Sequence, residues 1–308
     1  MNEIFQSTIS HKISFKGIGL HTGKTSNISI LPAKEDEGVV FKRIDLKKNN
    51  FIKANFKNVT TARLCTTLEN SFGVKVSTVE HLLAALYFSG IDNVLIEIDN
   101  EEVPIMDGSS KDFLDVLQKT SLKEQSKKRK YLKILNKVEL LEGSRKISIE
   151  PNESSLEVNF QLSYENKLIG NQRNKVDFQK DCLNEVVNSR TFCLFEDIEK
   201  IKKIGLAKGG SLDNAIVVKN DKILNEGGLR NDKEFVNHKI LDLAGDFLLS
   251  GFRIIGKVTC HQGGHELTNL FLRKILNSDS NFQAYEIKEL EISNKFHSKE
   301  LEKIAVNA

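Results

Sequence analysis

The longest regular pattern of apolar and polar residues lies between Glu234 and Leu249. At 3.6 residues per turn, most of its apolar residues fall on one side of a helix, whereas His238 and Asp242 fall on another. Asn231 followed by Glu234 has the spacing of a capping box, which predicts that the helix begins there and runs for about four turns. His238 and Asp242 would then lie one turn apart on the same face.

Upstream of this helix, the pattern predicts several strands followed by a helix, a strand and a second helix. Short alternating runs with turn residues between them occupy about the first seventy residues and are typical of strands and hairpins. The segment 77–89 predicts a helix, with Ser77 and Glu80 in capping-box spacing and Gly90 at its end. A buried strand, IDNVLIEID, and a helix at about 111–119 follow.

The remainder of the chain repeats this order of elements. Strands are expected at about 132–141, 146–150 and 155–162, and the long helix is followed by the strand FRIIGKVTC and a helix at about 266–276. The repetition predicts an internal duplication, and therefore an α+β protein of two similar domains at 1–125 and 126–280. The basic segment KEQSKKRKY is interpreted as the linker between them, and residues 281–308 as a loosely packed tail.

Only the second half carries extra material between its strands and its long helix. A helix is expected near 178–187, a short helix within SRTFCLFEDIEKIKKIGLAKGGS, and further segments at NAIVV and NDKILNEGG. An insertion in one of two repeats usually serves a functional site. We therefore expect the insertion near 190–212 to contribute to such a site.

Composition narrows the class of protein. The 45 basic and 42 acidic residues give a net charge of +3, which offers no support for binding nucleic acid. No apolar run is long enough to span a membrane and the N-terminus lacks the pattern of a secretory signal, so a cytoplasmic protein is expected. The four cysteines have no CxxC spacing, which disfavours disulfides and a thiolate zinc site.

The pair His238 and Asp242 has the spacing of two metal ligands on one helix. An imidazole nitrogen and a carboxylate oxygen one turn apart can face a single point, although an intrahelical ion pair has the same spacing. In a duplicated protein, the helix that begins with Glu80 and His81 would hold the equivalent place and could supply His81 as a third ligand. Glu80 could then act as a general base, unless it only caps its helix.

Further polar residues are candidates for chemistry. His265, in HQGGHE, is a candidate acid, and Asp246 could orient its ring and raise its pKa, although a surface histidine at a helix start would look the same. His21, in GIGLHTG, is interpreted as a turn residue. The hydroxyl of Thr191 could donate a hydrogen bond to an oxyanion or could be an ordinary cap.

Several segments of the chain together carry a more specific signal. STVEHLLAAL, IDNVLIEID with PIMDGSS, SRTF, GLAKGGSLDNAIVV, NEGGLRNDKEFVNHKILDLAGD and GGHELTN follow one another between residues 5 and 276. In this order they resemble the UDP-3-O-acyl-N-acetylglucosamine deacetylases, zinc enzymes of lipid A synthesis. The resemblance implies two similar α+β domains, with helices packed between two outer sheets and the active site at the domain interface. It also implies an enzyme that removes the acetyl group from acylated UDP-N-acetylglucosamine. The sequence does not indicate the oligomeric state, and a monomer is expected by default.

The same resemblance implies a metal site and its chemistry. Zinc would be held by His81, His238 and Asp242, with a fourth position open. Glu80 would be the general base, and His265 the charged acid that stabilises the oxyanion and protonates the leaving amine.

Other residues are implied to assist or to bind the substrate. Asp246 would assist the acid, and Thr191 would donate to the carbonyl oxygen. Lys239 resembles the lysine that meets the polar head of the substrate. Phe192 and Leu194 would line an apolar passage for the acyl chain, together with the rest of the insertion.

The sequence departs from the family where the nucleotide is gripped. Family members carry an aromatic residue and a His-Pro pair there, whereas this chain reads FQLSYENKLIG. Leu162 is assigned to the aromatic position, and Tyr164 is the alternative for stacking on uracil. Two other functions compete: a non-catalytic protein that binds an acylated sugar nucleotide, and a zinc amidase for an unrelated amide. The presence of both Glu80 and His265 favours an enzyme over the binding protein. The resemblance over both domains and the insertion favours the deacetylase over the amidase.

Overall fold

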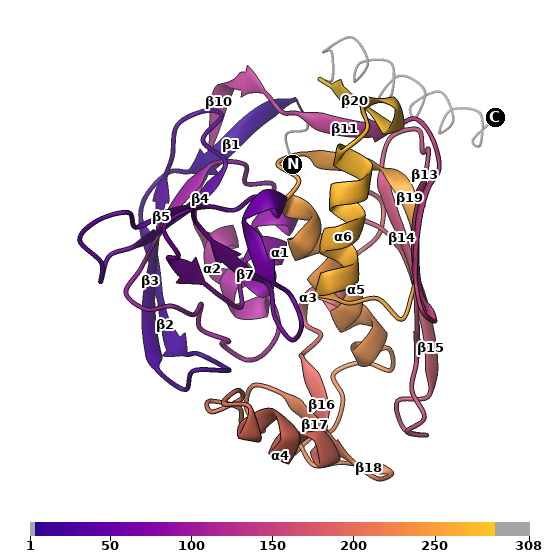
Figure 1. Ribbon diagram of the computed structural model, residues 1–308. Helices are drawn as coiled ribbons and strands as arrows, with labels where there is room; N and C mark the ends of the chain where they lie inside the picture. The colour runs from indigo at the N-terminus through magenta and orange to yellow at the C-terminus, as the bar shows by residue number, and fades with distance from the viewer. Residues whose placement is uncertain (1–3, 287–308) are drawn as a thin grey trace, which may run out of the picture.

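Two β-sheets enclose a layer of helices in the structure, a computed structural model that describes residues 4–286 (Figure 1). The layer contains α1 (Glu80–Phe88), α2 (Lys111–Lys119), α3 (Asn184–Val187), α5 (Glu234–Leu248) and α6 (His265–Leu276). This arrangement confirms the predicted α+β class and the helices between outer sheets. None of the helices within residues 4–286 is long and apolar enough to cross a membrane.

The first sheet is built from the N-terminal half of the chain. Its strands lie in the order β2 (Ile13–Ile18), β3 (Thr25–Pro32), β9 (Val94–Ile98), β4 (Val39–Arg43) and β5 (Phe51–Lys53). The central strand β9 is parallel to β4 and antiparallel to β3. Buried residues alternate with less buried ones along β3 and β9, as a strand with one face on the core requires.

The second sheet is built from the C-terminal half. Five of its strands lie in the order β12 (Val138–Glu142), β13 (Arg145–Glu150), β19 (Arg253–His261), β14 (Leu156–Ser163) and β15 (Asn171–Asp177), with β19 in the centre. Strand β19 is parallel to β14 and antiparallel to β13, so these five of the sheet's seven strands have the order and directions of the first sheet. The likeness supports the internal duplication, while the domain bounds at 125 and 280 stay a prediction.

The segment interpreted as a linker is a strand, and that prediction was wrong. Residues 122–128 form β10, which pairs with β1 (Phe5–Ile9). Its side chains are mostly exposed, and Lys127 pairs with Asp36. The strand lies at an edge and faces solvent, so its composition is as polar as that of a linker. The expected tail at 281–308 also begins differently, since β20 (Phe282–Tyr285) pairs with β11 (Tyr131–Ile134). Residues 287–308 lie outside the described part of the chain.

Several predicted boundaries also change. The strand expected at 132–141 is divided between β11 and β12, and the helix expected near 178–187 is only α3. The insertion forms β16 (Phe192–Leu194), α4 (Phe195–Lys203), β17 (Ile216–Lys219) and β18 (Lys222–Ile223). Three strands of the insertion make a small separate sheet at the bottom of Figure 1. Elsewhere β6 (Val59–Thr61), β7 (Thr67–Glu69) and β8 (Lys75–Val76) form another small sheet, preceded by the 3-10 turn η1 (Phe56–Asn58); a second turn, η2 (Asp279–Asn281), precedes β20.

Neither predicted capping box forms. Helix α1 has no side-chain cap, and the hydroxyl of Ser77 donates to the carbonyl oxygen of Glu101 instead. Helix α5 also lacks one, because the carboxylate of Glu234 accepts hydrogen bonds from Arg190 and from the backbone of Arg230. The helices begin close to the predicted residues, but the carboxylates of their first residues, Glu80 and Glu234, accept hydrogen bonds from other parts of the chain.

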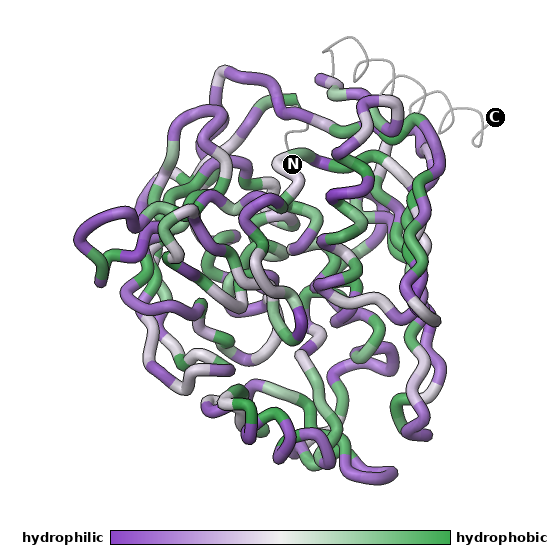
Figure 2. Tube along the Cα trace, in the orientation of Figure 1, coloured by the Kyte–Doolittle hydropathy of each residue, from purple (hydrophilic) through white to green (hydrophobic). Residues whose placement is uncertain are grey.

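Helix α5 is almost completely enclosed, and it packs against α1 through Gly245. Every residue of α5 except Lys239 is buried, so its polar residues face other elements rather than solvent. Figure 2 shows apolar residues along these central helices, with polar residues concentrated in the outer loops. A Cβ atom at Gly245 would lie 2.0 Å from the carbonyl oxygen of Glu80, so only glycine permits this approach. The contact brings Glu80 and His81 beside His238 and Asp242.

Replacement of Gly245 by Ala is expected to destabilise the protein, because the added Cβ collides with backbone and not with a flexible side chain. Overpacking of this kind costs about 1–3 kcal/mol, which lowers the midpoint of thermal unfolding. Gly264→Ala is the control, since its Cβ would meet nothing within 4 Å and its φ of −178° is extended. Equal midpoints for the two variants would contradict the close-packing role of Gly245.

Candidate active site

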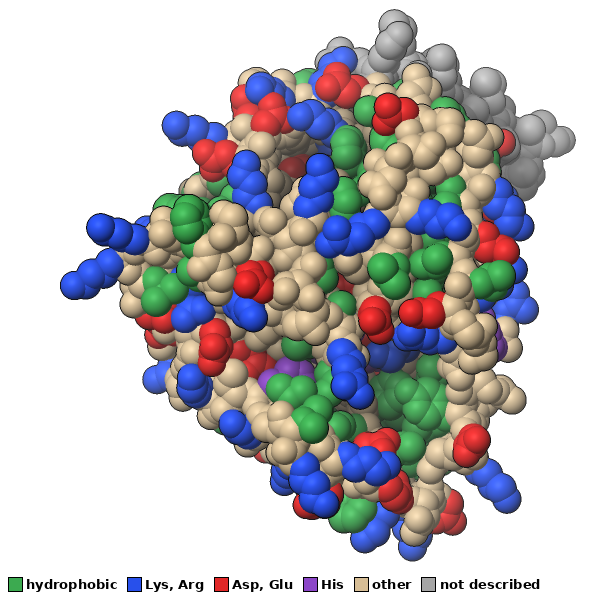
Figure 3. Space-filling view, viewed as in Figure 1, with side chains coloured by type: hydrophobic (Ala, Val, Ile, Leu, Met, Phe, Trp, Pro, Cys, Tyr) green, Lys and Arg blue, Asp and Glu red, His purple; other side chains and the backbone are tan. Residues whose placement is uncertain are grey.

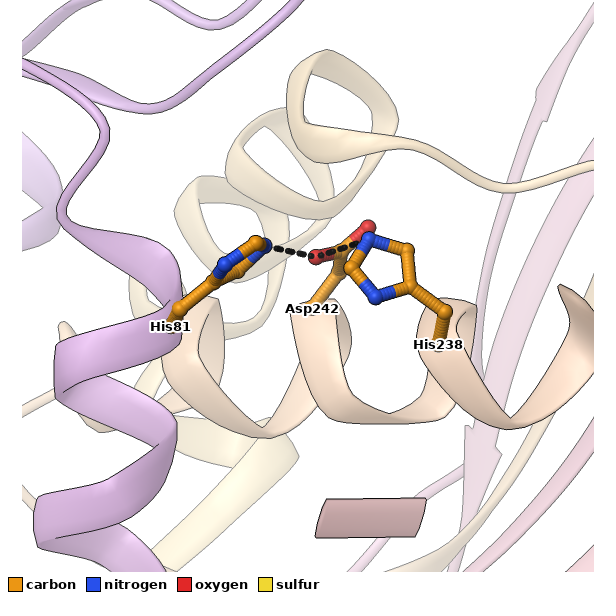
Figure 4. Close-up of side chains that lie close together, drawn as sticks. All are labelled: His81, His238 and Asp242. Atoms are coloured by element: carbon orange, nitrogen blue, oxygen red, sulfur yellow. Dashed lines mark ion pairs between the residues drawn. The ribbon is translucent and has the colours of Figure 1, made fainter. Parts of the chain in front are cut away.

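Three ligand atoms from two helices converge between the halves of the protein (Figure 4). Nε2 of His81 and Nε2 of His238 each lie 3.4 Å from Oδ1 of Asp242. That oxygen is buried and has no hydrogen-bond partner within residues 4–286. The three ligand atoms lie within 4.8 Å of one another. A metal ion with three protein ligands fits this arrangement, because it would satisfy the buried oxygen and both nitrogens.

Neighbouring groups hold these ligands in a form that can bind a metal. Nδ1 of His238 lies 3.1 Å from the carbonyl oxygen of Ser189, which can only accept, so Nδ1 carries the proton and Nε2 keeps its lone pair. Burial lowers the pKa of His238 to about 3, which keeps the ring neutral. Lys239 donates to Oδ2 of Asp242 over 2.9 Å and leaves Oδ1 for the metal.

A second polar group lies against the metal ligands. Nδ1 of His265 is 2.8 Å from Oδ2 of Asp246, and Nε2 of the same ring is 3.6 Å from Oε1 of Glu80. Thr66, which the sequence analysis missed, donates its backbone N–H to Glu80 over 3.1 Å and its hydroxyl to Asp246 over 2.6 Å. One residue thus orients two carboxylates. No motif around Thr66 indicates this role.

Burial and neighbouring charges have opposite effects on the pKa values of His265 and Glu80. Burial alone would lower the pKa of His265, but the carboxylates of Asp246, Glu80 and Asp242 outweigh it and raise that pKa to about 10. Burial raises the pKa of Glu80, while the adjacent His265 and His81 oppose that shift. A charged imidazole therefore lies next to a carboxyl group that could exchange a proton with substrate.

The first strand of the insertion, β16, and the residue before it reach the same site. The backbone N–H of Thr191 donates to the carbonyl oxygen of Gly108 over 2.8 Å, which fixes its position. The ring of Phe192 lies 6.3 Å from that of His238, and Nζ of Lys239 lies 5.6 Å from the Phe192 ring centre. Leu194 lies at the far end of β16, paired with Val218. The structure therefore places Phe192 beside His238, and Leu194 farther along the insertion.

Leu162, the residue assigned to the family's aromatic position, is a core residue of β14. This side chain is only 2% exposed, because it belongs to the inward-facing set of β14 and packs in the core. Tyr164 is 36% exposed, and its ring lies 5.8 Å from that of Phe192. Leu162 therefore lies in the core, whereas Tyr164, two residues later, lies beside the site. Figure 3 shows hydrophobic side chains in a hollow of this face, just above the insertion.

A cavity of about 590 Å³ lies between the loop at 61–67 and the end of the insertion at 204–208. Apolar side chains on its walls include Leu64, Ile204 and Leu206. His21 also lines it, in the turn where the sequence placed this residue, and neither nitrogen of its buried ring has a partner within the described chain. The cavity therefore offers both apolar surface and an unused polar group next to the candidate site.

The buried pair of Arg190 and Glu234 was also missed by the sequence analysis. Glu234 is fully buried and accepts hydrogen bonds from the backbone N, Nε and Nη2 of Arg190. This pair holds the segment between Ser189, whose carbonyl orients His238, and Thr191. A local sequence pattern cannot reveal this ion pair, because Arg190 and Glu234 are 44 positions apart in the chain.

Replacement of Glu234 by Gln is expected to weaken metal binding by about 10- to 100-fold, the usual effect of losing a group that orients a ligand. The loss follows because Arg190 would no longer hold the carbonyl of Ser189 against His238. Competition with a chelating dye measures the metal affinity. Glu226→Gln, at an exposed position, should leave it unchanged, and equal affinities for the two variants would contradict the role of the pair.

Comparison with known proteins agrees with this geometry. The family model described as UDP-3-O-acyl N-acetylglycosamine deacetylase matches residues 6–277. A protein of this name from Pseudoalteromonas translucida is 39% identical, over 90% of this chain and 92% of its own length. Those from Geobacter sp. and Helicobacter pylori are 40% and 39% identical, over 89% and 91% of this chain and 89% and 94% of their own lengths. The chain therefore belongs to the UDP-3-O-acyl-N-acetylglucosamine deacetylase family.

Proposed function

We propose that the protein hydrolyses the acetamide of UDP-3-O-(3-hydroxyacyl)-N-acetylglucosamine, a step of lipid A biosynthesis. The products are UDP-3-O-(3-hydroxyacyl)-glucosamine and acetate. The observation that carries the proposal is the buried cluster of His81, His238 and Asp242, with Glu80 and His265 directly beside it. Membership of the family supplies the substrate.

Zinc is the proposed metal. Two imidazoles and one carboxylate are a ligand set of catalytic zinc, and three protein ligands leave a position for other groups. When bound, zinc would act as a Lewis acid toward the acetamide carbonyl. His81, His238 and Asp242 would hold it, and all three side chains are buried.

The polar group beside the metal supplies proton transfer. Glu80 takes the proton of the attacking water, and its Oε2 is held by the N–H of Thr66 while Oε1 faces the reaction. His265 is charged, stabilises the oxyanion and donates its Nε2 proton to the leaving amine. Asp246 accepts from Nδ1 and so fixes the orientation of the ring. The hydroxyl of Thr191 donates to the carbonyl oxygen.

The substrate is bound at both ends. Lys239 meets the polar head of the substrate, and the exposed ring of Tyr164 is the proposed platform for uracil in place of Leu162. Phe192 and Leu194 form part of the apolar wall that receives the acyl chain. A cytoplasmic location and a monomeric state remain predictions of the sequence.

The test of the function is deacetylation of the acylated UDP-N-acetylglucosamine by the purified protein, with and without a chelator. Release of acetate that stops with chelation and returns with added zinc supports the proposal. Binding of the substrate without acetate release would instead indicate a non-catalytic binding protein. Equal hydrolysis of unrelated acetamides would indicate a general amidase.

Substrate that lacks the 3-O-acyl chain is expected to have a much lower kcat/KM. Each methylene buried against apolar surface contributes about 0.8 kcal/mol, and part of this binding energy is used to align the acetamide at the metal. The measurement compares kcat/KM for UDP-N-acetylglucosamine with and without the acyl group. Similar values would show that the apolar wall does not bind the chain.

A further inference from the structure

We propose that Glu102 is a positioning residue for the active site. Its buried side chain joins the start of α1, which carries Glu80 and His81, to the loop at 19–23, which carries His21. The inference rests on the proposed function for the roles of Glu80 and His81, and on geometry alone for the rest.

Glu102 is enclosed by neutral hydrogen-bond donors. It is 1% exposed, and its Oε1 accepts from the backbone N of His21 over 2.8 Å and from the hydroxyl of Thr78 over 2.9 Å. Its Oε2 accepts from the backbone N of Thr22 over 2.7 Å. All three donors are neutral: two are backbone N–H groups and one is a hydroxyl. Burial of a carboxyl group without a cation costs free energy. Glu102 therefore contributes to the structure through the three hydrogen bonds that it accepts.

One of these donors belongs to a strained residue. Thr78 has φ of +57°, in the left-handed region that β-branched residues avoid, and it lies two positions before Glu80. Such strain persists only where surrounding contacts determine the backbone, and it is frequent at functional sites. Here Ser77 is held between Glu101 and Val103 by backbone hydrogen bonds of 2.9 and 3.0 Å, and Glu102 holds the hydroxyl of Thr78. These contacts set the residue at which α1 begins and hence where Glu80 lies.

The other two donors belong to the loop at 19–23, which also holds the end of the insertion. The backbone N of Gly209 donates to the carbonyl oxygen of Leu20 over 3.0 Å, and that of Lys208 donates to His21 over 3.3 Å. The fit is tight, since a Cβ at Gly19 would lie 2.4 Å from Oε2 of Glu102. Glu102 therefore joins α1, the loop with His21 and the insertion, which come from distant parts of the chain.

The first experiment compares Glu102→Ala with Glu101→Ala. Glu101 is the matched control, because it is adjacent in sequence but exposed, and its side chain pairs with Lys24 over 3.1 Å. We expect Glu102→Ala to lower kcat at least tenfold with KM within about twofold. Glu80 is displaced, whereas the residues proposed to bind the substrate, Lys239, Tyr164, Phe192 and Leu194, take no part in the hydrogen bonds of Glu102. Amide hydrogen exchange should become faster in 19–24 and 76–82. Glu101→Ala should change neither quantity.

The second experiment separates the strain at Thr78 from general folding. Thr78→Ala and Thr78→Gly both remove the hydroxyl, but only glycine adopts φ of +57° without cost. We expect kcat of Thr78→Ala to be about tenfold below that of Thr78→Gly. We also expect Glu102→Gln, whose remaining carbonyl oxygen can still accept from His21 and Thr78, to recover part of the kcat lost in Glu102→Ala.

Two results would overturn the inference: a folded Glu102→Ala with wild-type exchange and kcat, or equal kcat for the two Thr78 variants. If Glu102→Ala does not fold, Glu102→Gln and the Thr78 pair decide in its place. Lack of deacetylase activity in the wild-type protein would refute the proposed function instead. In that case the exchange rates of 19–24 and 76–82 still decide whether Glu102 holds these segments.

Discussion

Replacement of Glu80 by Gln is expected to lower kcat by about two to four orders of magnitude, the range for loss of a positioned proton-transfer group. Glutamine has nearly the same shape and can still accept the hydrogen bond from Thr66, so the fold should persist. The metal ligands are untouched, so zinc content should stay at the wild-type level. The measurement pairs kcat at saturating substrate with zinc analysis of the same sample.

The control for this variant is Glu69→Gln, which neutralises a half-buried glutamate paired with Lys75 at 3.5 Å. It should keep wild-type kcat. His265→Ala should match the loss in Glu80→Gln, since the acid and the base act on the same substrate. A Glu80→Gln protein that retains more than about a tenth of wild-type kcat would exclude Glu80 as the general base.

Replacement of His238 by Ala is expected to remove both bound zinc and activity. The variant leaves only His81 and Asp242 as protein ligands, and two ligands do not form the three-ligand set of a catalytic zinc site. Asp242 would also be left as a buried carboxylate with Lys239 as its main partner. Zinc content after dialysis and the rate of acetate release measure the two effects, and activity should fall to the level of the chelated wild-type protein.

The matched control is His261→Ala, at the end of β19 and outside the ligand cluster. It should keep one zinc and full activity. If His238→Ala were to retain full zinc and full activity, the metal site would lie elsewhere. If it were to lose zinc but keep activity, the metal would be dispensable for the reaction.

The secondary structure was largely predictable because its signals are local. The helix at 234–249, the helix at 111–119 and the strands of both sheets are marked by the spacing of apolar residues, which burial on one face imposes. The spacing of His238 and Asp242 likewise follows from the geometry of a single helix. The errors arose where a tertiary contact replaced the local one. Glu234 pairs with Arg190 and does not cap its helix, and the basic segment at 122–128 pairs with β1.

The sequence by itself determined most of the elements, the family and the identity of the candidate metal ligands. Only the tertiary structure decided which residues hold them in place. Thr66, Ser189 and Glu102 act through backbone groups and buried hydrogen bonds between segments distant in sequence, and such contacts have no local periodicity. The role of Gly245 could not be predicted from the sequence either. Its lack of a side chain matters because the backbone of Glu80 comes within van der Waals distance, and that proximity exists only when α1 and α5 are packed.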